Sequence, residues 1–395
     1  MILCTTTLIL LSSSQAAFAS STKDTRLLQD PVCRNEALIL RNETEIGSGV
    51  YWSGQSWMFQ LGDLDGDGFF DLPAGLDALT CVPRGGGTKL TAYDLAFSTD
   101  GGFSTFLDGD LLRMRPNGVL DTWVGEQELL DAIQHQSGSF DLDGVAWKDD
   151  QLWFTVKDPI QSSTLGTVDD GDILLYDPYL GQITRMYTEA DVQGIVDQAT
   201  GSSTSIGDVR ALSFYPSTDE LVFTIQSPSA QDATVFGVGS GGGGGWIIPG
   251  WAEADWAFQE ATELDALAFL PEVVVQPPVL STDLPYLDQN SSAKIRIRHG
   301  SPLGLAKGLF SRKRGFEESL WGGAGAIFLD QNDSAYKRQI ANGWLHGTQL
   351  DASGSGDFDW VTQTLPPQYS YVDLYIQAFD VATRTLSNPI VLRLQ

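Results

Sequence analysis

The stretch LDGVAW, residues 142–147, decides the fold, because close copies of it recur along the chain. The copies are LDALTC (76–81), VRALSF (209–214) and LDALAF (264–269), at intervals of 66, 67 and 55 residues. All four begin with an apolar, a polar, a small and an apolar residue. Self-similarity at a nearly constant spacing is typical of proteins that repeat one structural unit.

Two further series of residues recur along the chain with almost the same period. The leading aspartates Asp108, Asp170 and Asp232 open the segments DGDLLRM, DGDILLY and DATVFGV and are spaced by 62 residues. The second series consists of aromatic residues spaced by 64 positions, namely Trp123, Tyr187 and Trp251. An acidic stretch that predicts a short helix follows each of them. The repeat unit is therefore about 64 residues long.

Each unit contains short β-type runs bounded by Asp, Gly, Pro and Ser, such as LWFTVKD (152–158). Repeated strands without intervening long helices predict an all-β protein. We expect a small β-propeller-like repeat domain over residues 46–270, in which GVYWSGQSWMFQLG (49–62) completes the blade that LDALAF begins. A β-solenoid or an array of stacked sheets is the alternative.

The pattern D-[LV]-x-A-[LV]-x-F followed by DGD-[LI]-L-x-Y-D-P resembles propeller-like repeats in secreted bacterial proteins that have no assigned activity. The resemblance covers residues 76 to about 270. It weakens in the third unit, where DGD becomes Asp232-Ala233-Thr234 and the inner aspartate becomes Arg210. It implies a fold and an extracellular location, and it implies no activity.

A Pro-rich, charge-poor linker is predicted at PEVVVQPPVLSTDLP, residues 271–285. Beyond it, residues 286–395 contain runs of alternating apolar and polar residues, which predict a β-sandwich domain. The closing stretch LYIQAFDVATRTLSNPIVLRL resembles the end of a small sandwich module that is appended to secreted bacterial multi-domain proteins.

The first 19 residues have an apolar run and then Ala17-Phe18-Ala19, which predicts a secretory signal peptide cleaved before Ser20. Residues 20–45 are then a separate N-terminal segment. The alternative is that the apolar start is a buried N-terminal strand. No later run is apolar for long enough to predict a membrane-spanning helix. We therefore expect a secreted, periplasmic or cell-surface protein.

Cysteine usage agrees with that location. Cleavage at the predicted site removes Cys4 and leaves Cys33 and Cys81 as an even pair in an oxidising compartment. The sequence therefore predicts a Cys33–Cys81 disulfide.

The chain is strongly acidic, with a formal net charge of -28, and the charge is uneven. Before Tyr286 there are 12 basic and 41 acidic residues, whereas the remainder has 11 and 10. Such an acidic domain repels nucleic acid and anionic membranes, so we expect neither as a partner. It suits a cation, or a glycan or protein at a surface.

One segment has the ligand spacing of a calcium site. QLGDLDGDGFFD (60–71) places oxygen ligands at positions 1, 3, 5, 7 and 9 of a loop and Gly68 at position 6, where the chain must turn. The predicted Ca²⁺ ligands are Asp63, Asp65, Asp67, the Phe69 carbonyl and Asp71. Because position 12 is Ala74 rather than Glu, the motif resembles the short DxDxDG loops of extracellular repeat proteins rather than an EF-hand. A polar turn that binds no ion is the alternative.

The polar position of the repeated motif supplies a second candidate site. In a propeller the first strand of each blade lines the central channel, so these side chains would form an acidic ring that binds a cation or an amine-bearing ligand. The candidate residues are Asp77, Asp143, Arg210 and Asp265. The alternative is that each aspartate accepts backbone hydrogen bonds from a neighbouring loop.

No sequence motif points to a catalytic nucleophile, and the chain has only three histidines. The expected function is a non-enzymatic, calcium-stabilised binding or cell-envelope interaction protein. One alternative is a secreted polysaccharide hydrolase or lyase that uses acidic residues of the channel. Another is a purely structural adhesin.

Overall fold

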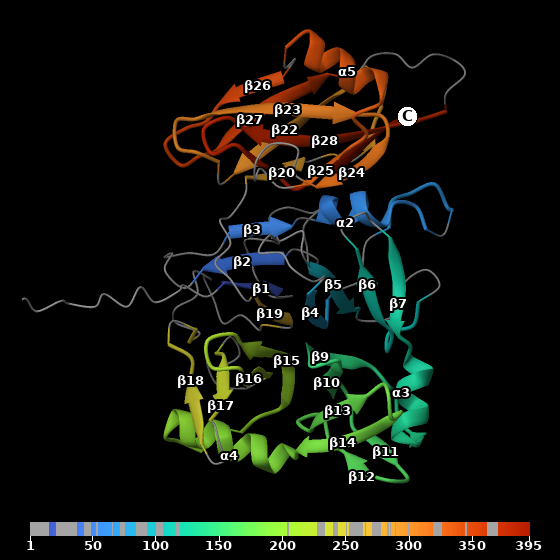
Figure 1. Cartoon of the computed structure of the whole chain (residues 1–395), viewed down its shortest axis with the longest axis vertical. Helices are drawn as coiled ribbons and strands as arrows, with labels where there is room; N and C mark the ends of the chain where they lie inside the picture. The colour runs from blue at the N-terminus through green and yellow to red at the C-terminus, as the bar shows by residue number, and fades with distance from the viewer. Residues whose placement is uncertain are drawn as a thin grey trace, which may run out of the picture.

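The structure is a computed structural model. It describes residues 16–20, 38–42, 49–52, 54–64, 66–71, 76–83, 93–99, 106–115, 119–203, 205–226, 234–239, 244–249, 251–252, 264, 266–270, 278–282, 284, 286–288, 290–298, 300–318, 326–343, 346–361 and 370–395. Strands dominate these residues, so the prediction of an all-β protein is confirmed (Figure 1). Across the described part of the chain, no helix has the length and apolarity needed to cross a membrane.

Four antiparallel four-stranded sheets form the first part of the molecule. Sheet 1 contains β19 (Ala266–Leu270), β1 (Ala16–Ser20), β2 (Leu38–Asn42) and β3 (Gly49–Trp52). Sheet 2 contains β4 (Ala78–Pro83), β5 (Tyr93–Ser98), β6 (Leu111–Met114) and β7 (Leu120–Val124). Sheet 3 contains β9 (Leu142–Lys148), β10 (Gln151–Val156), β13 (Ile173–Asp177) and β14 (Gln182–Tyr187). Sheet 4 contains β15 (Asp208–Tyr215), β16 (Glu220–Gln226), β17 (Phe236–Val238) and β18 (Gly245–Ile247).

The repeated motif of the sequence forms one edge strand of each sheet. These strands, β19, β4, β9 and β15, contact one another in a closed circuit: β4 touches β9, β9 touches β15, β15 touches β19 and β19 touches β4. The other strands of each sheet lie outward from them (Figure 1). We call this arrangement the four-sheet ring and these four strands its inner strands.

Small residues at the third motif position allow the inner strands to approach closely. These residues are Ala78, Gly144, Ala211 and Ala266. A Cβ added at Gly144 would lie 3.0 Å from Thr155 Oγ1 and 3.2 Å from the Ala211 carbonyl carbon. The small residue in the motif is therefore a packing requirement at the centre of the ring.

Hydroxyl groups at one repeated position join neighbouring sheets. The Ser98 Oγ of sheet 2 donates a hydrogen bond to the Leu142 carbonyl of sheet 3 at 3.1 Å. Thr155 Oγ1 donates to the Val209 carbonyl at 2.9 Å, and Thr224 Oγ1 donates to the Leu264 carbonyl at 2.9 Å. Each bond satisfies a buried carbonyl, so the hydroxyls fix the order and spacing of the sheets.

Short helices follow the last strands of three sheets. α3 (Glu126–Ile133) follows β7, and α4 (Glu189–Thr200) follows β14, as the acidic stretches predicted. α4 begins with a capping box between Thr188 and Asp191, which satisfies its first backbone N–H groups. The equivalent helix after β3 is α2 (Gly54–Leu61). The acidic stretch after Trp251 lies largely outside the described residues, and Trp251 itself is fully buried.

The two ends of the repeat region meet in sheet 1. β3 and β19 belong to the same sheet, as expected for residues 49–62, although residues 54–61 form α2. β1 lies between β19 and β2, with Ala16 opposite Leu270 and Ser20 opposite Ala266. Residues 16–20 are thus a strand of the ring in the full-length chain. The predicted signal peptide, with cleavage before Ser20, stays a prediction.

The C-terminal part contains two larger sheets and a hairpin (Figure 1). β20 (Val279–Thr282), β22 (Ser292–Arg298) and β27 (Gly356–Val361) form the first sheet. The second contains β21 (Tyr286–Leu287), β30 (Ile390–Leu394), β28 (Val372–Asp380), β23 (Leu305–Ser311) and β26 (His346–Gln349), and β29 (Thr385–Leu386) pairs with β28. The hairpin is β24 (Arg314–Glu318) and β25 (Ala326–Leu329), and α5 spans Ser334–Ala341. β20 lies within the segment predicted as a linker.

The four-sheet ring carries an additional three-stranded sheet, which contains β8 (His135–Ser137), β11 (Ile160–Ser162) and β12 (Gly166–Val168). It stands beside α3 on sheet 3.

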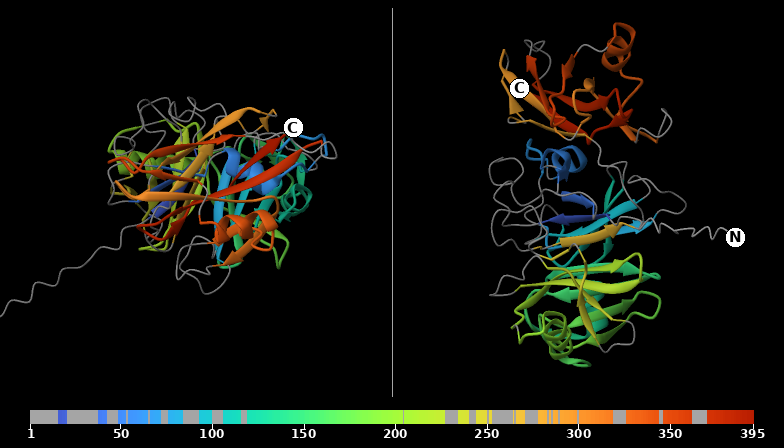
Figure 2. Two further views of the ribbon diagram at one scale, coloured as in Figure 1. Left: turned by 90° about the horizontal axis from the view of Figure 1, so that it is seen from above. Right: turned by 90° about the vertical axis from the view of Figure 1, so that its left-hand side faces the viewer.

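α2 lies between the ring and the C-terminal part, as both figures show (Figure 2). Its Trp57 and Leu61 pack in the core between sheets 1 and 2. Its Met58 and Phe59 pack against Val391 of β30, and Phe59 meets the rings of Phe328 and Tyr375 edge to face. α2 is therefore apolar on two faces because both are covered.

Candidate functional site

The predicted acidic ring is assembled at the N-terminal ends of the inner strands. Asp77 directly precedes β4, Asp143 is the second residue of β9, and Arg210 is the third residue of β15. The fourth candidate, Asp265, lies outside the described residues. Two further aspartates, Asp141 and Asp208, stand beside them on the same ends of the strands. We call these residues, with Lys157, the axial cluster.

The four described aspartates of the axial cluster are deeply buried. Asp143 is fully buried, and the other three aspartates are between 4% and 7% exposed. Arg210 Nη1 lies 3.5 Å from Asp143 Oδ1, and Arg210 Nε lies 3.5 Å from Asp208 Oδ2. These carboxylates therefore pair with a cation of the ring itself. Binding of a cation or an amine-bearing ligand in a central channel stays a prediction, as does the alternative that the aspartates accept backbone hydrogen bonds.

Lys157 is the member of the cluster that the sequence analysis missed. It follows β10, and its Nζ lies 3.4 Å from Asp141 Oδ2 and 3.7 Å from Asp77 Oδ2. Its backbone N–H donates to the Asp141 carbonyl at 3.1 Å. The available signal was a charged residue at the end of the apolar run LWFTV, at the point where a second strand reaches the end of the ring.

Burial suppresses the ionisation of three of these carboxyl groups, those of Asp141, Asp143 and Asp208. Burial, together with the charge of Asp77, raises the pKa of Asp141 to about 7 even though Lys157 is close. Burial also raises the pKa of Asp208 to about 6 and, with the charge of Asp208, raises the pKa of Asp143 well above its usual value. The cluster therefore holds protons at a pH where ordinary aspartates have lost them.

Asp143 and Asp208 lie within hydrogen-bonding reach of each other. One oxygen of each carboxyl, Asp143 Oδ2 and Asp208 Oδ1, is buried and has no hydrogen-bond donor among the described residues. A proton held between the two carboxyls satisfies both oxygens, in the way that close carboxyl pairs share one proton.

The predicted calcium loop is only partly described, because Asp65 lies outside the described residues. Asp63 Oδ2 accepts a hydrogen bond from the Gly68 N–H at 3.1 Å, and Asp67 Oδ1 accepts one from the Phe69 N–H at 2.7 Å. Asp71 Oδ2 accepts one from the Leu64 N–H at 2.5 Å. Three carboxylates thus fold the loop on itself, and Asp63 Oδ1 is buried with no hydrogen-bond partner among the described residues.

A cation of the C-terminal part contacts the same loop. Arg393 donates from Nη1 to the Gly68 carbonyl, and the same nitrogen lies 3.9 Å from Asp63 Oδ2. The guanidinium also lies 4.3 Å above the Phe70 ring, and the Phe70 N–H donates to the Tyr286 hydroxyl at 2.7 Å. Within the described residues, no three acidic, histidine or cysteine side chains lie close enough to hold a metal ion. The calcium site stays a prediction.

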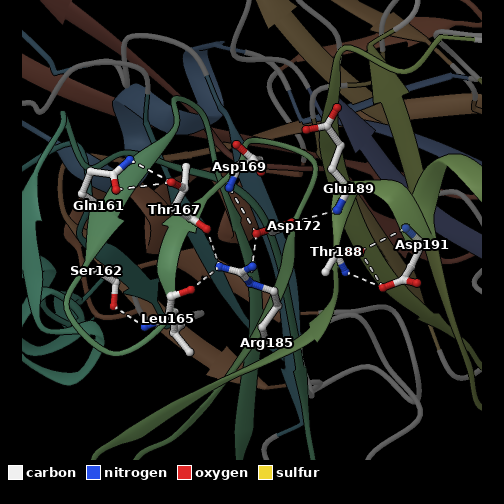
Figure 3. A network of polar contacts seen from close by, with 10 residues as sticks. All are labelled: Gln161, Ser162, Leu165, Thr167, Asp169, Asp172, Arg185, Thr188, Glu189 and Asp191. Carbon is white, nitrogen blue, oxygen red and sulfur yellow. Dashed lines mark hydrogen bonds and ion pairs between the residues drawn. The ribbon is translucent and has the colours of Figure 1, made fainter.

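Two later DGD turns have a structural role. Asp172 Oδ2 accepts from the Asp169 N–H at 3.1 Å, and its Oδ1 accepts from the first N–H of α4, at Glu189, at 2.8 Å (Figure 3). Arg185 Nε lies 3.1 Å from the same carboxylate (Figure 3). Asp110 accepts in the same manner from the N–H groups of Leu107 and Glu126. These aspartates join a turn to the start of a helix.

The predicted disulfide is not tested, because Cys33 lies outside the described residues. Cys81, which forms no disulfide within the described residues, packs against the core between sheets 1 and 2. Burial raises the pKa of this thiol to about 12, so it stays protonated and reacts slowly near neutral pH.

No protein-family model matches the chain, and no curated protein matches it. Among solved structures, it is similar to a superoxide reductase (neelaredoxin) from Ignicoccus hospitalis, at 8% identity and a TM-score of 0.17, over 30% of this chain and 80% of that one. A fungal alcohol oxidase of the AA5 family has 11% identity and a TM-score of 0.17, over 91% and 60%. The Neurospora crassa Pan2 WD40 domain has 8% identity and a TM-score of 0.19, over 97% and 74%. At these TM-scores none of the three contributes to the assignment of fold or function.

Proposed function

We propose that the protein is a secreted, non-enzymatic binding module in which the four sheets are the blades of a small β-propeller and the C-terminal part is a β-sandwich. The inner strands contact one another in a closed circuit, which supports the propeller. The axial carboxyls are buried and face Arg210 and Lys157, which favours a stabilising role over contact with a polymeric substrate. The proposed ligand is a surface glycan or protein.

The position of the aspartate loop carries the proposal of calcium stabilisation. Residues 62–71 connect α2 to sheet 2, and they contact Tyr286 and Arg393 of the C-terminal part. An ion bound by Asp63, Asp65 and Asp67 would fix the loop at the junction of the two parts. The buried Asp63 Oδ1, which has no partner in the described part of the chain, would be one of its ligands.

Thermal unfolding tests the calcium proposal. We expect millimolar Ca²⁺ to raise the unfolding midpoint of the full chain above its value in EDTA, because an ion that binds only the native state stabilises it. Asp65→Ala should abolish the rise, whereas Asp359→Ala, at an exposed position of β27, should retain it. Superimposable curves with and without Ca²⁺ would show that the loop is a turn without an ion.

One observation favours the alternative of a polysaccharide hydrolase or lyase. The pKa of Asp141, about 7, lies where a general acid works best. Incubation with a panel of polysaccharides and an assay for new reducing ends separates the two functions. Turnover that Asp143→Asn abolishes would overturn the non-enzymatic proposal, and the absence of new reducing ends would support it.

A further inference from the structure

The axial cluster joins two adjacent sheets of the ring through like charges. Asp143 belongs to β9 of sheet 3 and Asp208 to β15 of sheet 4, and these inner strands contact each other. Two carboxyls in hydrogen-bonding reach attract each other when they share a proton and repel each other when both are ionised. At this position repulsion acts directly between two sheets.

We propose that the Asp143–Asp208 pair is a proton-operated lock between sheets 3 and 4. With one proton between them, the pair closes the contact between β9 and β15. Without it, two buried negative charges face the single guanidinium of Arg210, which lies 3.5 Å from each. The contact then loosens, because a buried charge without a full partner is costly.

The surroundings of the pair do not relieve this repulsion. The charged groups that act on Asp143 and Asp208 from neighbouring elements are Arg210 of β15, Asp77 before β4 and Asp170 before β13. Asp141, two residues from Asp143, is paired with Lys157. Among the described residues, Arg210 is the cation that contacts the pair and the other nearby groups are mostly anions, so the lock responds to pH without a histidine.

The direction of the pH dependence follows from linkage. The folded state retains a proton that the unfolded chain has released, because the pKa of Asp208 is raised to about 6 and that of Asp143 is raised well above its unfolded value of about 3.9. Stability is therefore complete below the unfolded pKa and falls as the pH rises through the folded pKa values. The protein should be more stable in mild acid than at alkaline pH.

Thermal unfolding of the full chain from pH 5 to 8.5 tests the proposal. We expect the wild-type midpoint to fall by roughly 5 °C or more over this range. Asp143→Asn keeps the shape and supplies an N–H donor to Asp208 at every pH. The unfolding midpoint of this variant should fall less over the same range. The variant should be more stable than the wild type at pH 8.5, and equally or slightly less stable at pH 5.

Two controls separate the lock from the general acidity of the chain. Asp359→Asn removes one exposed negative charge from β27 and should run parallel to the wild type at every pH. Hydrogen exchange should show that amides of β9 and β15 lose protection at pH 8 before those of β22 and β28. If Asp143→Asn does not fold, we expect Asp208→Asn to show the same result, a higher midpoint than the wild type at pH 8.5 and an equal or slightly lower one at pH 5. Variants that are destabilised equally at pH 5 and pH 8.5, or uniform loss of protection, would overturn the proposal.

Discussion

Arg393 joins β30 of the C-terminal part to the aspartate loop at the junction of the two parts. It forms a two-pronged ion pair with Asp373, at 2.8 and 3.0 Å, and its guanidinium lies 4.3 Å from the rings of both Phe70 and Tyr371. It is 4% exposed. An arginine stacked between aromatic rings and paired bidentately is not replaceable by lysine.

We predict that Arg393→Ala lowers the free energy of unfolding by about 3 kcal/mol, because it leaves Asp373 and the Gly68 carbonyl without their cation. Arg298→Ala, which removes an exposed pair with Asp357, should cost less than about 1 kcal/mol. Urea denaturation of the three proteins measures both values. Equal effects of the two substitutions would contradict the central role of Arg393.

The position of a side chain could be predicted from the sequence, but its contacts with other sheets could not. Asp77, Asp143 and Arg210 lie at the same end of the inner strands, since a repeated motif places its members at equivalent positions. The sequence did not predict that Arg210 neutralises Asp143, nor that Lys157 joins the cluster, because both contacts link different sheets. The contact between Arg393 and the aspartate loop joins residues 325 positions apart, and no local pattern contains it.

At the scale of elements, the inter-sheet hydroxyls make a direct prediction. Thr224→Val keeps the shape of the side chain and removes the hydrogen bond to the buried Leu264 carbonyl. It should lower the free energy of unfolding by about 1–2 kcal/mol, the cost of one unsatisfied buried acceptor. Thr218→Val, in the exposed turn between β15 and β16, should change it by less than about 0.5 kcal/mol. Chemical denaturation that ranks the two variants equally would refute this role of the hydroxyls.

The elements that the sequence predicted best are those within the repeat. Inner strands and the helices after Trp123 and Tyr187 lie where the repeated series indicated. β1 was the hardest to recognise, because AAFAS is short and rich in small residues and fits a cleavage signal as well as it fits a strand. Its partner β19 is at the other end of the repeat region, so only tertiary structure reveals the pairing.

For the whole molecule, the ring depends on β1 to link β19 with β2. A chain that begins at residue 21 lacks this strand and leaves two unpaired edges in sheet 1, whereas a chain that begins at residue 16 retains all of it. We predict a markedly lower unfolding midpoint, with aggregation, for the shorter chain alone. Thermal unfolding with light scattering compares the two. Identical midpoints would mean that the ring closes without β1, as cleavage before Ser20 requires.

The all-β class of the whole molecule was predictable, since alternating patterns and a 64-residue period appear in the letters themselves. The contact between the parts was not. α2 has the place of α3 and α4 in the repeat but carries Trp57, Met58 and Phe59 instead of acidic residues. That departure from its own repeat is the one sequence signal that another part of the chain covers it.

The split composition of sheet 1 also sets an order of events during synthesis. The strands β1, β2 and β3 leave the ribosome first, yet their inner partner β19 is made only after sheets 2, 3 and 4 are complete. At 5–20 residues per second, this delay is roughly 12 to 50 seconds. Sheets 2 to 4 pair strands that are close in sequence and can form as they emerge, whereas closure waits for the most distant contact. The nascent chain therefore spends its longest interval with sheet 1 incomplete and the ring not closed. A chaperone would be needed most at this stage.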